Sequence, residues 1–287
     1  MTTGELLRKT AARLKHHGIE DPQIEARILL GHAVELSPER LLASLEKRPT
    51  QSQIEKLEQF ILRRILHEPI AYVIRQKDFY GLSYYIDHRV LVPRPETELL
   101  VEKALDFARN RQFKNGIKIA DIGTGSGIIA ISLASHLKES AIFATDISAP
   151  ALEVASINCK KHNVEKQITF LHGDLLNPLT QPVDMIVANL PYIVKSAIDA
   201  LPPEIRCFEP IIALDGGDDG LRSIEMVLQQ ARQKINPDGC ILMEISLGQR
   251  SLLAHIVQRY FPNAPVTFYK DLGGIDRVVQ IEFNKSV

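Results

Sequence analysis

The second half of the chain alternates apolar runs of strand length with amphipathic segments of helix length. A crossover helix lets two neighbouring strands run parallel, so this alternation predicts an α/β fold with a mostly parallel, doubly wound sheet. The last two strand candidates are separated only by residues 271–276, which is too short for a crossover, and we expect them to pair antiparallel. Seven strands are predicted, at 117–122, 141–146, 168–173, 185–188, 240–245, 266–270 and 277–283, with helices at 127–137, 149–162, 220–235 and 249–260.

The first 75 residues lack this alternation and have the pattern of a small helical bundle. Apolar residues recur at helical spacing, and Asp21-Pro22 is a typical helix start. Because no glycine loop and no acid pair occur here, we expect residues 1–75 to recognise a partner or substrate. Residues 76–93, which include the apolar run 90–92, are predicted to form a connecting β-hairpin. Residues 94–287 are predicted to form the domain that contains the sheet, beginning with a helix at 96–109.

Composition argues against several other classes of protein. The 287 residues are 45% hydrophobic and 24% charged with a formal net charge of -1, so no global field favours nucleic acid or an anionic membrane. No apolar stretch approaches the roughly 20 residues of a membrane span, and no secretory signal is visible. Because Cys159, Cys207 and Cys240 lack metal-ligand spacing, we expect reduced thiols, no metal and a cytoplasmic location; we also expect a monomer.

A glycine loop follows the first predicted strand. Gly123, Gly125 and Gly127 allow a tight turn and let a ligand approach the backbone without a Cβ clash. Asp146 ends the next strand 19 residues after Gly127, about the distance at which nucleotide-binding folds place an acid on ribose hydroxyls. Asp174 follows a third predicted strand, at a position where an acid or amide commonly meets an adenine amino group. The predicted cofactor-binding residues are Asp121, Gly123, Thr124, Gly125, Ser126, Gly127, Asp146, Asp174, Leu175 and Asn189.

Two of these assignments have structural alternatives. A glycine loop by itself is weak evidence for a cofactor, and the alternative is that the glycines serve only the packing of the strand against the helix. For Asp121, one interpretation is an acid near the amino-acid portion of the cofactor, and the other is a cap on the glycine turn.

The tetrapeptide Asn189-Leu190-Pro191-Tyr192 follows the apolar strand 185–188, at the edge where open α/β sheets bind ligands. Asn189 offers an acceptor oxygen, and Pro191 favours an extended backbone that presents the Leu190 carbonyl. Tyr192 can stack on a planar group and exclude water. Beside a glycine loop, this motif indicates an S-adenosylmethionine-dependent methyltransferase acting on an amide or amino nitrogen, with these four residues as the catalytic set. The alternative is a rigid loop with a capping asparagine.

Over nearly its whole length the chain resembles the release factor glutamine methyltransferase family of the bacterial PrmC/HemK type. The resemblance is carried by the glycine loop and by residues 68–72, 90–98, 189–193, 209–210, 213–221 and 271–279. It implies a class I methyltransferase, Rossmann-like fold with a small N-terminal helical domain. It also implies methyl transfer from S-adenosyl-L-methionine to N5 of the glutamine in the Gly-Gly-Gln motif of class I peptide-chain release factors, with no membrane or direct nucleic-acid partner.

One position departs from the family pattern, which has Asn-Pro-Pro-Tyr where this chain has Leu190 in second place. The contact implied there is a main-chain carbonyl, which leucine retains. Asn-Leu-Pro-Tyr also resembles the motif of ribosomal RNA adenine dimethyltransferases, the alternative function, although those enzymes usually carry the cofactor domain before the helical one. A non-catalytic binding module is a third class. Arg94, Glu96 and Glu98 either line the substrate pocket, bridge to the helical domain, or mark a helix N-terminus.

Overall fold

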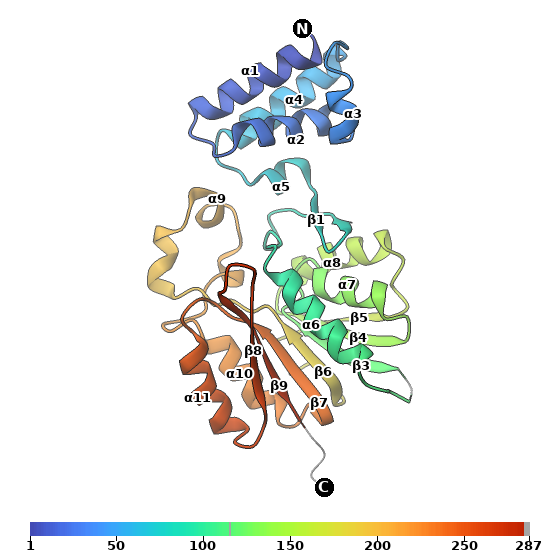
Figure 1. Ribbon diagram of the computed structural model, residues 1–287, viewed down its shortest axis with the longest axis vertical. Helices are drawn as coiled ribbons and strands as arrows, with labels where there is room; N and C mark the ends of the chain where they lie inside the picture. The colour runs from blue at the N-terminus through green and yellow to red at the C-terminus, as the bar shows by residue number, and fades with distance from the viewer. Residues whose placement is uncertain (115, 284–287) are drawn as a thin grey trace. The chain divides into compact units, whose positions relative to one another are not determined.

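The computed structural model describes residues 1–114 and 116–283, and the chain divides into two units (Figure 1). The smaller unit comprises Met1–Gln76 together with Pro202–Phe208, and the larger comprises Lys77–Leu201 together with Glu209–Val287. The predicted sheet domain includes residues 115 and 284–287, which lie outside the described residues. The domain boundaries at residues 75 and 93 stay predictions.

The smaller unit is a helical bundle, as predicted. Capping boxes begin two of its helices: the Thr2 and Thr50 hydroxyls accept from the N–H groups of Glu5 and Gln53, whose side chains accept in return from the N-cap N–H groups. Its helices are α1 (Thr3–His16), α2 (Pro22–Val34), α3 (Pro38–Leu42), α4 (Gln51–Arg64), α5 (Ile70–Ile74) and α9 (Pro203–Arg206). Their inward faces form a buried core that includes Leu14, Leu29, Leu30, Leu41, Leu57 and Ile61.

A buried arginine ties α9 into this unit. Arg64 is 5% exposed, and its guanidinium donates to Glu25 Oε2 at 2.6 Å and to Glu204 Oε1 at 3.3 Å. His67 Nδ1 lies 3.0 Å from the same Glu204 oxygen. A buried arginine without acidic partners is costly. Glu204, by pairing with Arg64, therefore stabilises the association of residues 202–208 with the N-terminal helices. Helical periodicity in the first 75 residues did not predict this later segment.

A seven-stranded sheet organises the larger unit, in the order β5-β4-β3-β6-β7-β9-β8. The strands are β3 (Ile117–Ile122), β4 (Ser140–Asp146), β5 (Ile168–His172), β6 (Val183–Ala188), β7 (Ile235–Glu244), β8 (Val266–Lys270) and β9 (Asp276–Glu282). Strands β3 to β7 pair in parallel, whereas β9 pairs antiparallel with β7 and β8. The mostly parallel sheet and its antiparallel end are therefore confirmed.

Helices cover both faces of this sheet (Figure 1). They are α6 (Thr97–Arg109), α7 (Ile128–His136) and α8 (Ala149–Lys161) on one face, and α10 (Arg222–Ala231) and α11 (Arg250–Tyr260) on the other. With both faces covered, strands β3 and β6 are buried almost throughout. Ile122 of β3 pairs with Ala188 of β6 and with Thr145 of β4. The glycine loop, the Asn189 motif and Asp146 therefore begin at the same edge of the sheet.

The hairpin is shorter than predicted. Strands β1 (Lys77–Phe79) and β2 (Leu82–Tyr84) pair antiparallel around Tyr80 and Gly81, which both have positive φ, 49° and 73°. The expectation that residues 90–92 form a strand is wrong, because they form a loop. The Val92 N–H donates to the carboxylate of Glu209 in place of a strand partner.

The connection between β6 and α10 contains helical turns that the sequence did not predict. Two short 3-10 helices, η1 (Lys195–Ala200) and η2 (Ile211–Ala213), flank α9. Across the whole described part of the chain, no helix has the length and apolar character needed to cross a membrane.

Candidate active site

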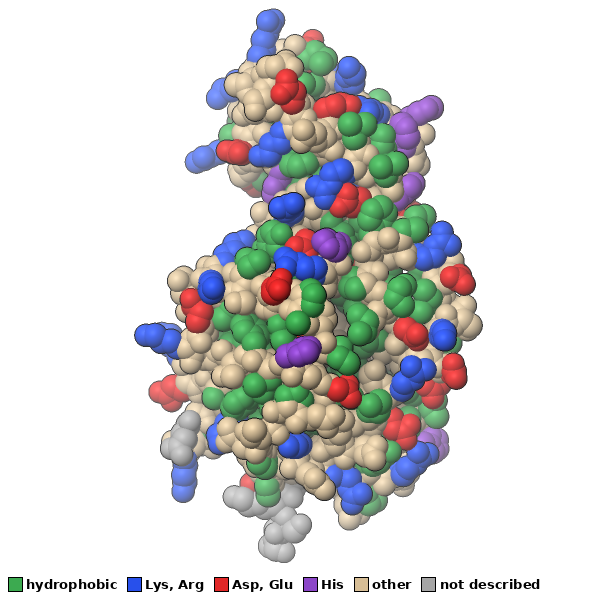
Figure 2. Space-filling model, turned by 180° about the vertical axis from the view of Figure 1, so that it is seen from behind, with side chains coloured by type: hydrophobic (Ala, Val, Ile, Leu, Met, Phe, Trp, Pro, Cys, Tyr) green, Lys and Arg blue, Asp and Glu red, His purple; other side chains and the backbone are tan. Residues whose placement is uncertain are grey.

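A cavity of about 500 Å³ lies in the larger unit at the carboxyl ends of β3, β4, β5 and β6. It adjoins the point between β3 and β6 where the strand order reverses, the usual ligand position in such sheets. Hydrophobic side chains gather around a hollow on the face drawn in Figure 2. The predicted residues that line the cavity are Gly123, Thr124, Gly125, Ser126, Asp146, Asp174, Leu175, Asn189, Leu190 and Pro191. Three others, Asp121, Gly127 and Tyr192, are outside its lining.

The three loop glycines have positive φ but different surroundings. Gly123, Gly125 and Gly127 have φ of 69°, 54° and 83°. A Cβ at Gly127 would lie 2.9 Å from a methyl carbon of Ile131, so this glycine serves helix packing. A Cβ at Gly125 would meet only the Gly123 carbonyl oxygen, at 3.9 Å, and would enter the space beside the cavity. Gly125 therefore leaves room for another group to approach the main chain of the loop.

Asp146 links this loop to the end of β4. Its Oδ2 accepts from the Gly125 N–H and its Oδ1 from the Ser148 N–H, both at 2.8 Å. Burial raises the pKa of Asp146, and these main-chain donors partly oppose the effect. Each carboxylate oxygen retains a second lone pair, so the group can also accept hydrogen bonds from a ligand's hydroxyls.

The contacts of Asp121 match the second of its two interpretations, a cap on the glycine turn. Its Oδ2 accepts from the Thr124 hydroxyl at 2.7 Å and from the Ala130 N–H at 3.1 Å. The side chain is fully buried, and this burial raises its pKa to about 7. Asp121 Oδ1 is buried with no hydrogen-bond partner among the described residues.

A hydrogen bond to α6 orients the side-chain amide of Asn189. Its Nδ2 donates to Thr97 Oγ1 at 3.0 Å, so Oδ1 is the atom left to accept from a ligand. Leu190 is 4% exposed, and its side chain covers Gly123: a Cβ there would lie 3.1 Å from Leu190 Cδ2. The leucine at the departure from the family pattern is therefore a packing residue beneath the glycine loop.

Tyr192 points to a buried acid that the sequence analysis missed. The Tyr192 hydroxyl donates to Glu244 Oε1 at 3.3 Å, and burial raises the pKa of Tyr192. Glu244 ends β7, one strand beyond β6, and is 1% exposed. An acid at the end of the otherwise apolar run 240–245 was the available signal.

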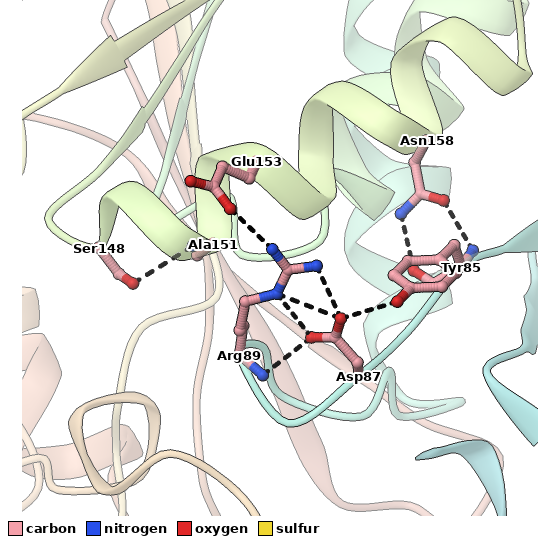
Figure 3. A network of polar contacts seen from close by, with 7 residues as sticks. All are labelled: Tyr85, Asp87, Arg89, Ser148, Ala151, Glu153 and Asn158. Carbon is pink, nitrogen blue, oxygen red and sulfur yellow. Dashed lines mark hydrogen bonds and ion pairs between the residues drawn. The ribbon is translucent and has the colours of Figure 1, made fainter. Parts of the chain in front are cut away.

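A polar network secures the loop that precedes α6 (Figure 3). Arg89, which lines the cavity, donates to Asp87 and to Glu153 of α8, each at 2.7 Å. Although burial opposes it, hydrogen bonding from Arg89 lowers the pKa of Asp87 to about 2. Asn158 of α8 is fully buried and bonds both the N–H and the carbonyl of Tyr85, at 2.7 and 2.9 Å.

Asn158 also reaches the glycine loop. Its Nδ2 donates to the Ser126 carbonyl at 2.9 Å, so one side chain joins that loop to the segment after the hairpin. This residue was absent from the predicted site because a single asparagine within a helical pattern gives no sign of such contacts.

The three charged residues near α6 have different places. Arg94 lines the cavity and donates to buried Glu209 at 2.5 Å. Glu98 accepts from the Tyr80 N–H at 2.8 Å, and Glu96 lies 3.8 Å from Arg277. Of the three, only Arg94 borders the cavity in the described residues.

The sheet order with its antiparallel end, and the cavity beside a glycine loop, define a class I methyltransferase. A solved hMettl16 catalytic domain in complex with MAT2A 3′UTR hairpin 1 shares the fold, with a TM-score of 0.58, 15% identity and coverage of 86% of each chain. This chain belongs to the release factor glutamine methyltransferase family. The member from Moorella thermoacetica is 37% identical over 278 residues, which cover 96% of this chain and 97% of the relative.

Family models match two separate stretches. One described as the PrmC N-terminal domain matches residues 5–74, and one described as ribosomal protein L11 methyltransferase (PrmA) matches residues 97–209. A bifunctional methyltransferase from Rickettsia typhi is 36% identical over 296 residues, which cover 96% of this chain. The chain spans 56% of that relative's length, a little over half.

Proposed function

We propose that this chain transfers a methyl group from S-adenosyl-L-methionine to the side-chain amide nitrogen of the glutamine in the Gly-Gly-Gln motif of class I peptide-chain release factors. Membership of the family supports the proposal, because the Moorella relative carries the name release factor glutamine methyltransferase over nearly the same length. The observation that carries it is the orientation of Asn189, whose NH₂ is held by Thr97 while its oxygen remains to accept from an amide.

The cofactor assignment rests on the two strand ends beside the glycine loop. Gly125 would let the cofactor approach main-chain atoms, and Asp146 would accept from its ribose hydroxyls. Asp174 and Leu175, which line the same cavity, would face its adenine. When bound, S-adenosylmethionine would supply an electrophilic methyl group on a sulfonium.

The substrate assignment rests on the chemistry of an amide nitrogen. Its lone pair is delocalised into the carbonyl, so methyl transfer needs good alignment and stabilisation of the positive charge that develops on nitrogen. In the proposed arrangement Asn189 Oδ1 and the Leu190 carbonyl accept from the two N–H groups of the glutamine. Tyr192 packs beside them and excludes water. This assignment uses no general base, because the positively charged N-methyl amide formed by the transfer is acidic enough to lose its proton to water.

Methylation of adenine in ribosomal RNA is the alternative, and the observations favour it less. The helical unit precedes the sheet along the chain, which is the reverse of the usual order in those enzymes. The stretch 5–74 matches the PrmC N-terminal domain, and the sheet uses the C-terminal part up to β9.

The smaller unit is proposed to recognise the body of the release factor, and the cytoplasm is the proposed place of action. Two exposed leucines near the end of α4 offer apolar contact: Leu62 is 48% and Leu66 72% exposed. Leu62→Ser with Leu66→Ser should raise KM for intact release factor by about tenfold, the effect of losing roughly one buried leucine contact. Leu252→Ser in the larger unit, at 47% exposed, is the control.

KM for a short Gly-Gly-Gln peptide should stay the same in all these variants, because none of the three leucines lines the cavity in which the glutamine would bind. An unchanged KM for the intact factor in the double variant would contradict the recognition role.

The function itself is tested by following labelled methyl transfer from S-adenosylmethionine to purified release factor, with ribosomal RNA as the competing acceptor. A Gln→Glu change in the Gly-Gly-Gln motif should stop the transfer, because a carboxylate has no nucleophilic nitrogen and no N–H pair. Label on RNA with none on the release factor would overturn the proposal.

A further inference from the structure

The loop that precedes α10 is joined to the Asn189 motif through main-chain atoms. The Ile193 N–H donates to the Leu214 carbonyl at 3.1 Å, and the Gly216 N–H donates to the Ile193 carbonyl at 2.8 Å. A Cβ at Gly216 would lie 2.8 Å from the Pro191 carbonyl oxygen, so this glycine permits close contact between the two backbones. The side chains of the loop are therefore held at fixed positions beside the residues proposed to bind the glutamine amide.

Two side chains of opposite charge, Asp215 in this loop and Arg222 at the start of α10, line the cavity. Asp215 Oδ1 accepts from the Gly217 N–H at 2.8 Å, and Oδ2 has no hydrogen-bond partner among the described residues. The Arg222 guanidinium lies against the same glycine, because a Cβ at Gly217 would lie 2.9 Å from its Nε and 3.0 Å from its Cζ. Gly217, with φ 90°, thus both turns the chain and makes room for the guanidinium.

Arg222 differs from the two other arginines that line the cavity. Arg89 and Arg94 are both paired with acids. Arg222 is exposed, and its guanidinium has neither an ion pair nor a hydrogen bond within residues 1–114 and 116–283. It follows that Arg222 and Asp215 are not paired with each other. The two groups therefore offer donors and an acceptor to a ligand in the cavity.

A donor and an acceptor held by one loop match the main chain of a polypeptide. In an extended chain the N–H and the C=O of one residue point to the same side, as in antiparallel strands that exchange two hydrogen bonds. The guanidinium can donate to such a carbonyl while the carboxylate accepts from the N–H. The backbone of a nucleic acid is negatively charged at every phosphate, so Asp215 would repel it. The pair therefore favours a polypeptide over RNA as the ligand.

We infer that Asp215 and Arg222 form a subsite that binds the main chain of the substrate next to the target glutamine. The inference rests on the proposed function, in which the Asn189 motif holds the glutamine side chain. A glycine has no side chain that could hold the main chain away from the two charged groups, which suits a Gly-Gly-Gln sequence. Because main-chain atoms are the same in every polypeptide, the subsite contributes affinity without selecting the residues around the motif.

Two aspartates near the start of α10 provide a matched test. Asp215→Asn keeps an oxygen for the Gly217 N–H but replaces Oδ2 by an NH₂ group, which opposes a substrate N–H. Its Kd for a capped Gly-Gly-Gln peptide should rise by about tenfold, the effect of losing a hydrogen bond to a charged group. Asp219→Asn is the control, because Asp219 accepts from the Leu221 N–H at 2.9 Å in the same way but lies outside the cavity lining.

Two arginines at opposite ends of α10 provide a second test. Arg222→Gln keeps a long polar side chain without the charge, and the Kd for the peptide should again rise by about tenfold. Arg232→Gln, at the other end of the helix and outside the cavity lining, is the control. Calorimetric titration in the presence of S-adenosylhomocysteine, which has no methyl group to transfer, measures each Kd. If Asp215→Asn and Arg222→Gln bind the peptide as tightly as the wild type, the inference is wrong.

The Kd for S-adenosylmethionine should change less than about twofold in all four variants, which would show that the fold and the cofactor site are retained. Changes in the peptide then identify the contact atom. Each main-chain N–H from the first glycine to the residue after the glutamine is replaced in turn by an ester oxygen. One ester should weaken binding to the wild type and have little effect on binding to Asp215→Asn. Equal effects on the two proteins at every position would contradict the role of Asp215.

Methyl transfer to the same peptide separates this inference from the proposed function. Transfer by the wild type, with the same KM in Asp215→Asn and Arg222→Gln, would overturn the subsite alone. Peptide binding that depends on Asp215 and Arg222, with no methyl transfer to the peptide or to intact release factor, would instead count against the proposed function alone.

Discussion

The cavity wall at the glycine loop is formed by main-chain atoms, whereas the wall at Asn189 is formed by a polar side chain. The glycine-loop side presents main-chain atoms, and its shape depends on positive φ at residues such as Gly125. The neighbouring Asn189 side presents a side chain, whose orientation depends on the hydrogen bond to buried Thr97. Substitutions should therefore act by steric exclusion on the first side and by altered polarity on the second, and the two kinds of failure should be separable by measurement.

The largest effect is expected on the glycine side. Gly125→Leu would place a side chain beside the cavity and force a leucine to φ 54°, so S-adenosylmethionine binding should be lost, by more than about 100-fold in Kd. Gly248→Leu is the control, because Gly248 has φ 86° and open space around it but lies outside the cavity lining. Calorimetric titration measures both. Retained affinity in Gly125→Leu would mean that the loop is not a cofactor cradle.

On the Asn189 side the loss should appear in the rate. Asn189→Ala removes the acceptor but leaves the glycine loop intact, so kcat should fall by about 100-fold, the scale of one lost transition-state hydrogen bond. The Kd for S-adenosylmethionine should change much less. Single-turnover methyl transfer and titration on the same preparation test this division. Loss of cofactor affinity without loss of rate would reverse the assignments of the two sides.

An intermediate effect is expected at Asp146, where side chain and main chain meet. Asp146→Ala should weaken S-adenosylmethionine binding by about 1–3 kcal/mol, the range for hydrogen bonds to a charged group. Asp184→Ala is the matched control: Asp184 also accepts a main-chain N–H, from Lys118 at 2.8 Å, but lies outside the cavity lining. Equal affinity for the cofactor in the Asp146 variant and in the wild type would remove Asp146 from the ribose site.

The smallest effect on activity is expected at Leu190. Leu190→Pro restores the family's usual motif and keeps the carbonyl, so kcat should stay within about threefold of the wild type. The substitution removes part of a buried side chain beneath Gly123, and the free energy of unfolding should fall by about 1–2 kcal/mol. Denaturant titration beside an activity assay distinguishes the two effects. A loss of activity with full stability would give the Leu190 side chain a direct part in the chemistry.

The site residues that can be predicted from the sequence are those whose positions follow from the ends of the apolar strands. The glycine loop, Asp146 and Asn189 each follow an apolar run, and parallel pairing brings the ends of those runs together. The Asn189–Thr97 contact joins residues 92 positions apart, and no local pattern encodes it. The apolar run 90–92 forms a loop and not the predicted strand, and its Val92 N–H donates to the carboxylate of Glu209, which is far away in sequence.

The later segment Pro202–Phe208 gives the two units more than one covalent link. The chain passes from one unit to the other after Gln76, enters the smaller unit again at Pro202, and leaves it after Phe208. A protease that cuts any one of these three crossings leaves the units joined by the other two. Release of an N-terminal fragment would need a cut near residue 76 and also the loss of the Arg64–Glu204 ion pair. The smaller unit is therefore interleaved with the larger one along the chain. Removing residues 1–76 would leave α9, one helix of the smaller unit, attached to the larger unit without its packing partners.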